Sequence, residues 1–208
     1  MVTAAPAYPV TFDVEYPERL SRWNTLFRWL LILPLVFFNV LGGVLVHPAY
    51  FALILLPFYP LLYVMAGTAI PVWFALLSNA RYPRLLFPIA VWAQRLILQI
   101  QAYELLVTDQ FPFDERDRPV RFEVHYPASQ SPVTVFFRLI LVIPHVAILF
   151  FLGIVLLATT VIAWFGILFT GNYPEGLWRF AVGTLRWSAR VGAYVSLLTG
   201  EYPPFSLS

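Results

Sequence analysis

The sequence contains no cysteine and no lysine among its 208 residues. Without cysteine, disulfide bonds, thiolate metal ligands and cysteine nucleophiles are all excluded. Without lysine, every positive charge is an arginine, which keeps its charge in any environment and binds phosphate through paired hydrogen bonds. An all-arginine set of positive charges suits contacts with lipid headgroups. A biased genomic base composition or a hot habitat would also explain the absence of lysine.

Charged residues are also scarce. They make up 12% of the chain, and hydrophobic residues make up 60%, whereas about a quarter of the residues in a typical soluble protein are charged. Residues 29–80 form a run of 52 positions without a formal charge, and residues 139–174 form a second run of 36. About 20 apolar residues suffice to cross a bilayer once, so the composition predicts an integral membrane protein. The net charge of +2 gives no reason to expect nucleic acid as a partner.

The chain repeats itself, and the spacing between the copies changes once. An alternating segment and the start of the apolar run match at an offset of 110 residues, and a segment with a Tyr-Pro turn matches at an offset of 91. The matching pairs are VTFDVEYP (10–17) with VRFEVHYP (120–127), FRWLLILP (27–34) with FRLILVIP (137–144), and WFALLSNARYPRLLF (73–87) with WFGILFTGNYPEGLW (164–178). The change of offset leaves 19 additional residues in the first copy.

These matches divide the chain into two tandem repeats. We expect the first repeat over residues 1–112, with its additional residues near 47–66, and the second over residues 120–208. Residues 113–119, FDERDRP, lie between them. Dense mixed charge ending in proline is typical of a solvated linker.

Each repeat is expected to begin with a β-strand, because apolar and polar residues alternate in 10–17 and 120–127. The uncharged run that follows favours a hydrophobic helical hairpin, with one long bent helix as the alternative for the shorter second run. Pro34 and Pro144 match across the repeats and are expected to bend these helices. An Arg-bearing amphipathic helix at the membrane interface completes each repeat. The fold class is therefore a mainly α integral membrane protein.

The helix expected in the second repeat, residues 179–194, carries three arginines in an apolar stretch. At 100° per residue, Arg179, Arg186 and Arg190 fall within about 40° of one another. Burying each of them at the bilayer centre would cost on the order of 2.5 to 3.5 kcal/mol. We therefore expect the helix to lie on the membrane surface, with the arginines on lipid phosphates or a partner and with Trp187 in the acyl boundary.

The matching helix of the first repeat, residues 83–106, keeps only the middle arginine of this stripe. Pro88 and Gln99 stand where the second repeat has its first and third arginines. The candidate residues for binding lipid or a partner are therefore Arg95, Arg179, Arg186, Arg190 and Trp187.

The distribution of charge predicts the orientation in the membrane. If each uncharged run enters the bilayer and returns, all arginines lie on one side, which the positive-inside tendency makes cytoplasmic. No charged region with a small-residue cleavage site precedes the first run, so we expect no removable signal peptide. The prediction is a multi-pass protein of the bacterial cytoplasmic (inner) membrane with cytoplasmic N- and C-termini, in which Arg81, Asp117 and Gly200 face the cytoplasm and Val44 faces outward.

Three segments of the sequence resemble a known family: VRFEVHYP (120–127), WFGILFTGNYP (164–174) and LRWSARVGAYVSLLTGEYPPFSL (185–207). The family is an uncharacterised group of bacterial membrane proteins, catalogued as a domain of unknown function and often found in tandem. The resemblance covers nearly all of the second repeat and, more loosely, the first. It implies the architecture and no activity.

No set of residues in the sequence suggests catalysis, so we expect no enzyme. His145, directly after Pro144 in the second uncharged run, is the candidate ligand for a haem or chlorin pigment. A histidine that is hydrogen-bonded within the protein is the more common case. We expect no metal site and no cofactor apart from bound lipid.

Three functions compete for a sequence of this kind. The first is an accessory or scaffold subunit that docks onto a larger membrane complex, because arginine and tryptophan are enriched at protein interfaces. The second is a membrane-shaping or lipid-organising protein built from hydrophobic hairpins and interfacial helices. We rank a transporter last, because the uncharged runs contain few polar residues to line an ion path.

Overall fold

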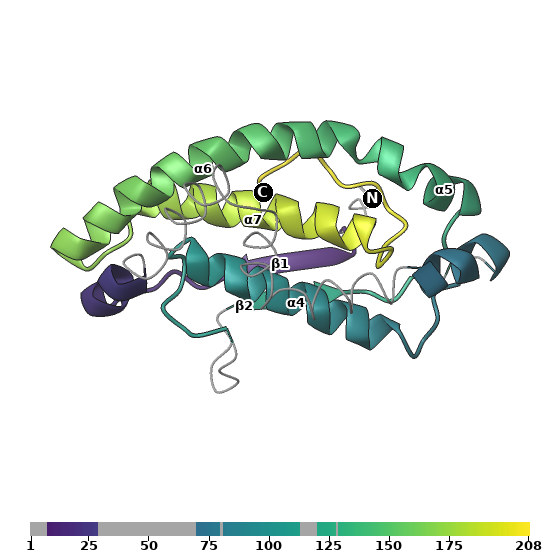
Figure 1. The fold of residues 1–208 in the computed structure, drawn as a ribbon, viewed down its shortest axis with the longest axis horizontal. Coiled ribbons are helices and arrows are strands. Elements are labelled where there is room, and N and C mark those ends of the chain that lie inside the picture. Colours follow the sequence, from purple (N-terminus) through teal and green to yellow (C-terminus); the bar gives the residue numbers. More distant parts are fainter. Residues whose placement is uncertain (1–7, 29–69, 80, 113–119, 128) are drawn as a thin grey trace, which may run out of the picture.

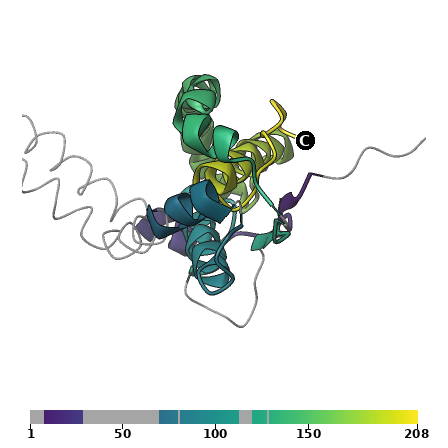
Figure 2. The ribbon, with the colours of Figure 1, turned by 90° about the vertical axis from the view of Figure 1, so that its right-hand side faces the viewer.

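The structure is a computed structural model of the chain, and it describes residues 8–28, 70–79, 81–112, 120–127 and 129–208. Helices dominate it, and two short strands pair at one side of the helices (Figures 1 and 2). The labelled elements are β1 (Val10–Val14), α4 (Phe87–Glu104), β2 (Val120–Val124), α5 (Pro132–Leu141), α6 (Ile143–Thr170) and α7 (Glu175–Val195). Residues 22–28 and Ile70–Asn79 are also helical.

The two strands pair with each other in antiparallel register. Phe12 lies opposite Phe122, and Val10 lies opposite Val124. The alternation read from the sequence is confirmed, because the apolar residues of β1 are buried while Thr11 and Asp13 between them are exposed. A two-stranded ribbon is marginally stable alone, so its apolar face needs a cover.

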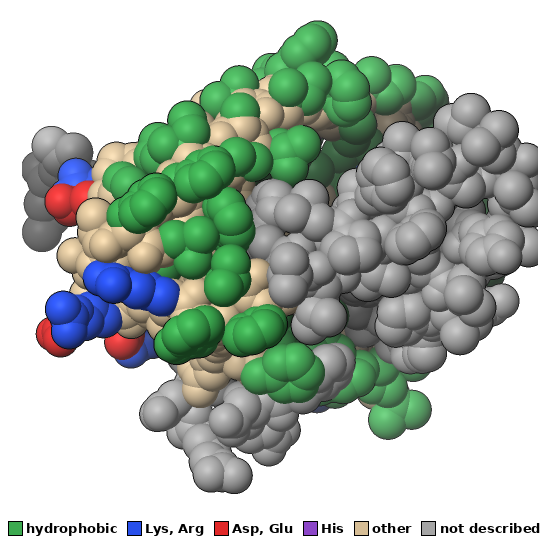
Figure 3. Space-filling model, turned by 60° about the vertical axis from the view of Figure 1, so that its left-hand side comes forward, with side chains coloured by type: hydrophobic (Ala, Val, Ile, Leu, Met, Phe, Trp, Pro, Cys, Tyr) green, Lys and Arg blue, Asp and Glu red, His purple; other side chains and the backbone are tan. Residues whose placement is uncertain are grey.

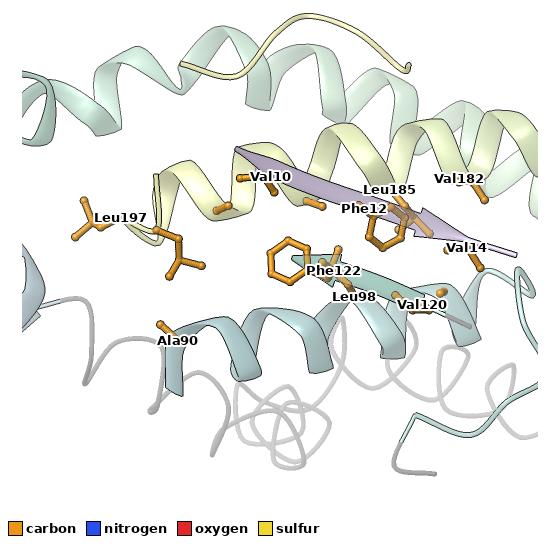
Figure 4. Packing of buried hydrophobic residues seen from close by; sticks show 14 of the residues in the cluster. Val10, Phe12, Val14, Ala90, Leu98, Val120, Phe122, Val182, Leu185 and Leu197 are labelled. Carbon is orange, nitrogen blue, oxygen red and sulfur yellow. The ribbon is translucent and has the colours of Figure 1, made fainter. Parts of the chain in front are cut away.

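Two helices supply that cover. The side chains of Phe12 and Phe122 point into a core that also contains Leu98 of α4 and Leu185 of α7 (Figure 4). β1 packs against α7, and β2 packs against α4. The apolar face of the strand pair is therefore buried in the protein's own core. Docking of a partner on this face would require the core to open.

Helix α7 lies at the centre of the described structure and packs against α6, α4 and β1 (Figure 1). Small residues allow this close packing: a Cβ atom added to Gly183 would lie 2.9 Å from the backbone oxygen of Leu207, and one added to Gly192 would lie 2.3 Å from the side-chain nitrogen of Gln94. We expected an amphipathic helix with Trp187 in the acyl boundary. Instead, Trp187 is buried against protein, because α6 and the C-terminal segment cover that side of α7.

The second uncharged run forms one long bent helix, so the hairpin that we favoured for it is wrong. Helices α5 and α6 are separated only by Val142, whose N–H still donates to the carbonyl of Arg138, and together they form a helix of 39 residues, Pro132–Thr170. Pro144 occupies the first turn of α6, where a missing N–H costs little. The next break is Gly171, which adopts a left-handed conformation (φ 82°) and ends the helix.

Several expectations concern residues outside the described part of the chain. These are the hairpin of the first run with Pro34, the outward position of Val44, the additional residues near 47–66 and the linker 113–119 with Asp117.

Candidate functional site

The outer surface of α5 and α6 is apolar along its whole length. Only one stripe of α6 is buried, including His145, Leu156, Thr160 and Ile167, and it rests mainly on α7. Large hydrophobic side chains cover the rest, and Figure 3 shows them along the upper face, away from a charged group at one edge. The exposed set includes Phe136, Phe137, Ile140, Phe150, Phe151, Ile154, Leu157, Ile162, Phe165 and Phe169. We call this set the α5–α6 apolar face.

This face has a physical consequence. Soluble monomers rarely expose contiguous apolar patches larger than a few hundred Å², whereas large apolar side chains are exposed along this 39-residue helix and no charged residue lies between Arg138 and Glu175. Within the described residues this is the one helix long and apolar enough to cross a membrane. Lipid or another apolar surface suits it far better than water.

Two arginines of the sequence-derived set hold the strands to the helices. Arg95 of α4 donates to the carbonyl of Phe122 at 3.0 Å, and Arg186 of α7 donates to the carbonyl of Phe12 at 3.0 Å. Arg186 also forms an ion pair with Asp13 at 3.0 Å. Because positions 95 and 186 match at the offset of 91, and the two strands match at 110, the same contact is made twice.

The other two arginines of the stripe differ in exposure. Arg190 donates to the backbone oxygens of Ser206 and Ser208, and burial together with the charge of Arg186 lowers its pKa. Arg179 pairs with Glu175 one turn earlier on α7, and both side chains are largely exposed. Arg179 is therefore the member of the stripe best placed to meet lipid or a partner, while binding by the whole set stays a prediction.

His145 and Trp187, singled out separately in the sequence, lie against each other. The indole Nε1 of Trp187 donates to Nδ1 of His145 at 3.1 Å. The ring of Phe205 stacks on the imidazole with centroids 4.0 Å apart, and Tyr202 stands beside it. The imidazole is fully buried, and its Nε2 has no hydrogen-bond partner. This enclosure favours a packing role for His145 over ligation of a macrocycle.

Two buried arginines were missed by the reasoning from sequence. Arg28 donates to the carbonyls of Tyr103 at 2.5 Å and Thr108 at 3.1 Å, and its guanidinium lies 3.5 Å above the ring of Tyr103. Arg138 donates to the carbonyl of Tyr194 at 2.8 Å, and its guanidinium lies 4.3 Å above that ring. Their matching positions directly before the two uncharged runs, in FRWLLILP and FRLILVIP, could have indicated that both arginines have the same structural role.

The two arginines differ in their counter-charge. Arg28 forms an ion pair with Asp109 at 3.0 Å. At the position that matches Asp109, the chain has Gly200. Arg138 instead donates to the neutral amide oxygen of Gln130 at 2.9 Å, and no described carboxylate pairs with it. A buried positive charge without a negative partner is costly.

Glu104 is the carboxyl group that most resembles a general acid in its surroundings. It lines a pocket of about 310 Å³ between α4, α6 and α7, together with Gln101, Thr184 and Ser188. Partial burial raises the pKa of Glu104. The residues that line this pocket include no second carboxyl group and no histidine, and the described part of the chain holds no cluster of three or more metal-ligating residues.

The described residues thus define a mainly helical chain with one strand pair and one helix long and apolar enough to cross a membrane. A family model described as Domain of unknown function (DUF4389) matches residues 132–206, so this part of the chain carries a DUF4389 domain. The match contains α5, α6, α7 and most of the C-terminal segment. Neither a curated protein nor a solved structure matches the chain.

Proposed function

We propose that this protein is a non-catalytic integral membrane subunit with an accessory or scaffold role in a larger complex of the cytoplasmic membrane. The observation that carries the proposal is the α5–α6 apolar face. A surface of this length has to be covered by lipid, by a partner or by both. Four arginines, Arg28, Arg95, Arg138 and Arg186, hold the chain's own elements together, which suits a scaffold.

We further propose that the chain consists of two copies of one unit. Matching residues make matching contacts in the described structure: Arg95 and Arg186 each hold a strand of the other copy, and α4 and α7 end alike. In both helix ends a leucine adopts a left-handed conformation, Leu106 with φ 62° and Leu197 with φ 65°. A residue in this conformation is uncommon unless it is glycine, so a chance coincidence at matching positions is a poor explanation.

The proposed placement of the long helix is along the membrane rather than through it. A helix of 39 residues is about 58 Å long, nearly twice the hydrocarbon thickness of about 30 Å. Because α7 returns alongside α6, a full crossing by α6 would draw Arg186 and Arg190 into the bilayer. Lying along the cytoplasmic interface, α5 and α6 can bury their apolar face while α7 stays behind them.

The test of the accessory role is gentle extraction from the native membrane, followed by sizing and mass spectrometry of the chains that migrate with this one. We expect a defined complex with at least one partner in fixed stoichiometry. The variant Ile154→Asp with Leu157→Asp charges two exposed positions of the apolar face and should reduce membrane association, partner retention or both.

The matched control adds two charges elsewhere. Asn172 and Gly176 are exposed, and a Cβ atom at Gly176 meets nothing within 4 Å, so Asn172→Asp with Gly176→Asp should leave association unchanged. Finding the protein only as a free monomer or homo-oligomer would contradict the accessory role.

Membrane shaping is the second candidate, because the long helix is arched (Figure 1) and large apolar side chains are exposed along it. An amphipathic helix that lies in one leaflet occupies area there and can bend the membrane. Free homo-oligomers that change vesicle curvature would favour this function over the first.

A further inference from the structure

We propose that a pocket beside Arg138 binds one anionic phospholipid, with an acyl chain in the pocket and the phosphate paired with the guanidinium of Arg138. This site is separate from the exposed arginine stripe of α7. It does not depend on the accessory role proposed above.

The pocket has a volume of about 520 Å³ and is formed by the helix Ile70–Asn79, by α5 and by the end of α7. Its lining is almost entirely apolar, and Trp73 stacks with Phe136 across it with ring centroids 6.5 Å apart. Among the described residues of the lining, Arg138 is the one that carries a charge. Its side chain is 2% exposed, so it is part of the pocket wall rather than a mobile surface group.

Arg138 has unused hydrogen-bonding capacity. A guanidinium offers five N–H donors, and in this structure one donates to Tyr194 and one to Gln130. The Nε atom is buried without a partner and lies out of reach of a ligand, so the phosphate would pair with the remaining N–H groups of the two terminal nitrogens. Both acceptors are neutral oxygens, so the charge itself has no counter-charge among the described residues.

The first copy shows what such an arginine requires. At the matching position, Arg28 is held by the carboxylate of Asp109, and the chain supplies that anion itself. In the second copy, Gly200 supplies none. Because burying an unpaired charge costs several kcal/mol, the geometry points to an anion from outside the chain.

The chemistry of the pocket identifies the anion. An apolar pocket of this size beside a single guanidinium suits an amphiphile with an acyl chain and a negatively charged head. Arginine pairs with phosphate through two parallel hydrogen bonds. Since the neighbouring α5–α6 face suits lipid, an anionic phospholipid is the occupant that meets both requirements.

The test compares phospholipid binding by the full chain and its variants in mild detergent, with native mass spectrometry at increasing lipid concentration. The probes are dioleoylphosphatidylglycerol, which is anionic, and dioleoylphosphatidylcholine, which is zwitterionic. We expect one phosphatidylglycerol molecule to bind wild type at least about tenfold more tightly than phosphatidylcholine, because the guanidinium pairs with the net negative charge of its headgroup. Inorganic phosphate should not displace it, because it fills no acyl pocket.

Two variants address the role of Arg138. Arg138→Gln removes the charge and should abolish the preference for phosphatidylglycerol. Gly200→Asp places a carboxylate beside Gln130, because a Cβ atom at Gly200 would lie 3.3 Å from the Gln130 side chain, and it should abolish the preference by supplying the missing anion from within. Arg121→Gln removes an exposed arginine outside the arginine stripe of α7 and should bind as wild type.

The proposal fails if wild type shows no preference for phosphatidylglycerol, or if folded Gly200→Asp and Arg138→Gln both keep it. Circular dichroism and size exclusion establish which variants fold. If Arg138→Gln does not fold, Gly200→Asp alone decides, because it leaves Arg138 in place. Displacement by inorganic phosphate at equal concentration would also overturn the proposal, because the site would then recognise only the anion.

Discussion

Arg28 is the residue whose removal should cost this fold the most among its arginines. Burial lowers the pKa of Arg28, while Tyr103 and Asp109 act in the opposite direction. Arg28→Gln would remove the guanidinium that donates to Oδ1 of Asp109 and to two backbone carbonyls. We expect a loss of about 2 to 3 kcal/mol in the free energy of unfolding, slightly less than for a fully buried pair because Asp109 is partly exposed. Thermal or denaturant unfolding in detergent micelles measures it.

Arg179→Gln is the matched control for this change. It also breaks an ion pair, but its side chain and that of Glu175 are exposed, and exposed pairs contribute about 0 to 1 kcal/mol. Equal losses for the two variants would show that burial does not set the importance of Arg28.

The buried Tyr173 makes the stability of the fold depend on pH in the alkaline range. Burial raises the pKa of Tyr173 to about 12, so the folded state keeps the phenol protonated at a pH where the unfolded chain ionises. Its contribution to stability is complete below about pH 10, and it is lost as the pH rises toward 12. We expect Tyr173→Phe to reduce the slope of stability against pH in this window by up to about 1.4 kcal/mol per pH unit.

The measurement is a series of denaturant titrations between pH 9 and pH 12 on both proteins. The slope at pH 7 to 9 serves as the internal control, because the phenol is protonated in both states there. An unchanged slope above pH 10 would show that Tyr173 ionises as easily in the folded protein as in the unfolded chain.

At this scale the sequence could identify candidate residues but not their partners. The charged stripe of α7 is visible in the spacing of its arginines, yet Arg186 bonds a carbonyl 174 positions earlier in the chain. Arg28 bonds a carbonyl 75 positions later. Helical periodicity gives only the face on which a side chain lies, and tertiary packing decides whether a lipid phosphate or a distant backbone oxygen meets it.

Gly171 sets where the long helix ends. Its left-handed conformation lets its N–H donate to Ile167, and its carbonyl accepts from Leu20. An alanine side chain would have room there, since the atom nearest to its Cβ would lie 3.6 Å away. The left-handed backbone conformation at this position, however, is unfavourable for alanine. We expect Gly171→Ala to lower the free energy of unfolding by about 1 kcal/mol, the usual cost of this conformation for a residue with a Cβ atom.

Gly176 provides the comparison within the same region. It lies in the first turn of α7, and a Cβ atom there meets nothing within 4 Å. Gly176→Ala should therefore be neutral or stabilise the protein by up to about 1 kcal/mol. Chemical denaturation of both variants measures the difference in the free energy of unfolding. A similar loss for both variants would contradict the prediction, because the loss would then not depend on the left-handed backbone of Gly171.

The elements themselves were largely predictable. Alternation located both strands, the spacing of arginines among apolar residues located α7, and the match at an offset of 91 residues located α4. The hairpin was wrong because a run of 36 uncharged residues fits either one long helix or two short arms. The run forms one long helix because α6 contains no break. Gly153 lies inside the helix, and the hydroxyls of Thr159 and Thr160 donate back to the carbonyl of Leu156.

At the scale of the whole molecule, the described elements separate their surfaces by chemistry. The apolar face lies outside α5 and α6, the arginine-bearing α7 lies behind it, and the strands lie to one side of the helices (Figure 2). No single stretch of sequence carries this arrangement, because it depends on α7 packing against three other elements. Its consequence is that both ends of the long helix should lie on the same side of the membrane.

That consequence can be tested directly, because the chain has no cysteine of its own. Ser131 is exposed directly before α5, and Gly176 is exposed just after the end of α6. Single cysteines at these two positions should resist a membrane-impermeant maleimide in intact cells and react after the membrane is permeabilised. The physical reason is that a helix along the cytoplasmic interface keeps both ends inside, whereas a helix through the bilayer separates them. Labelling of one position alone from outside would establish a single crossing and place α7 within the bilayer, and labelling of both would put the interface on the outer leaflet.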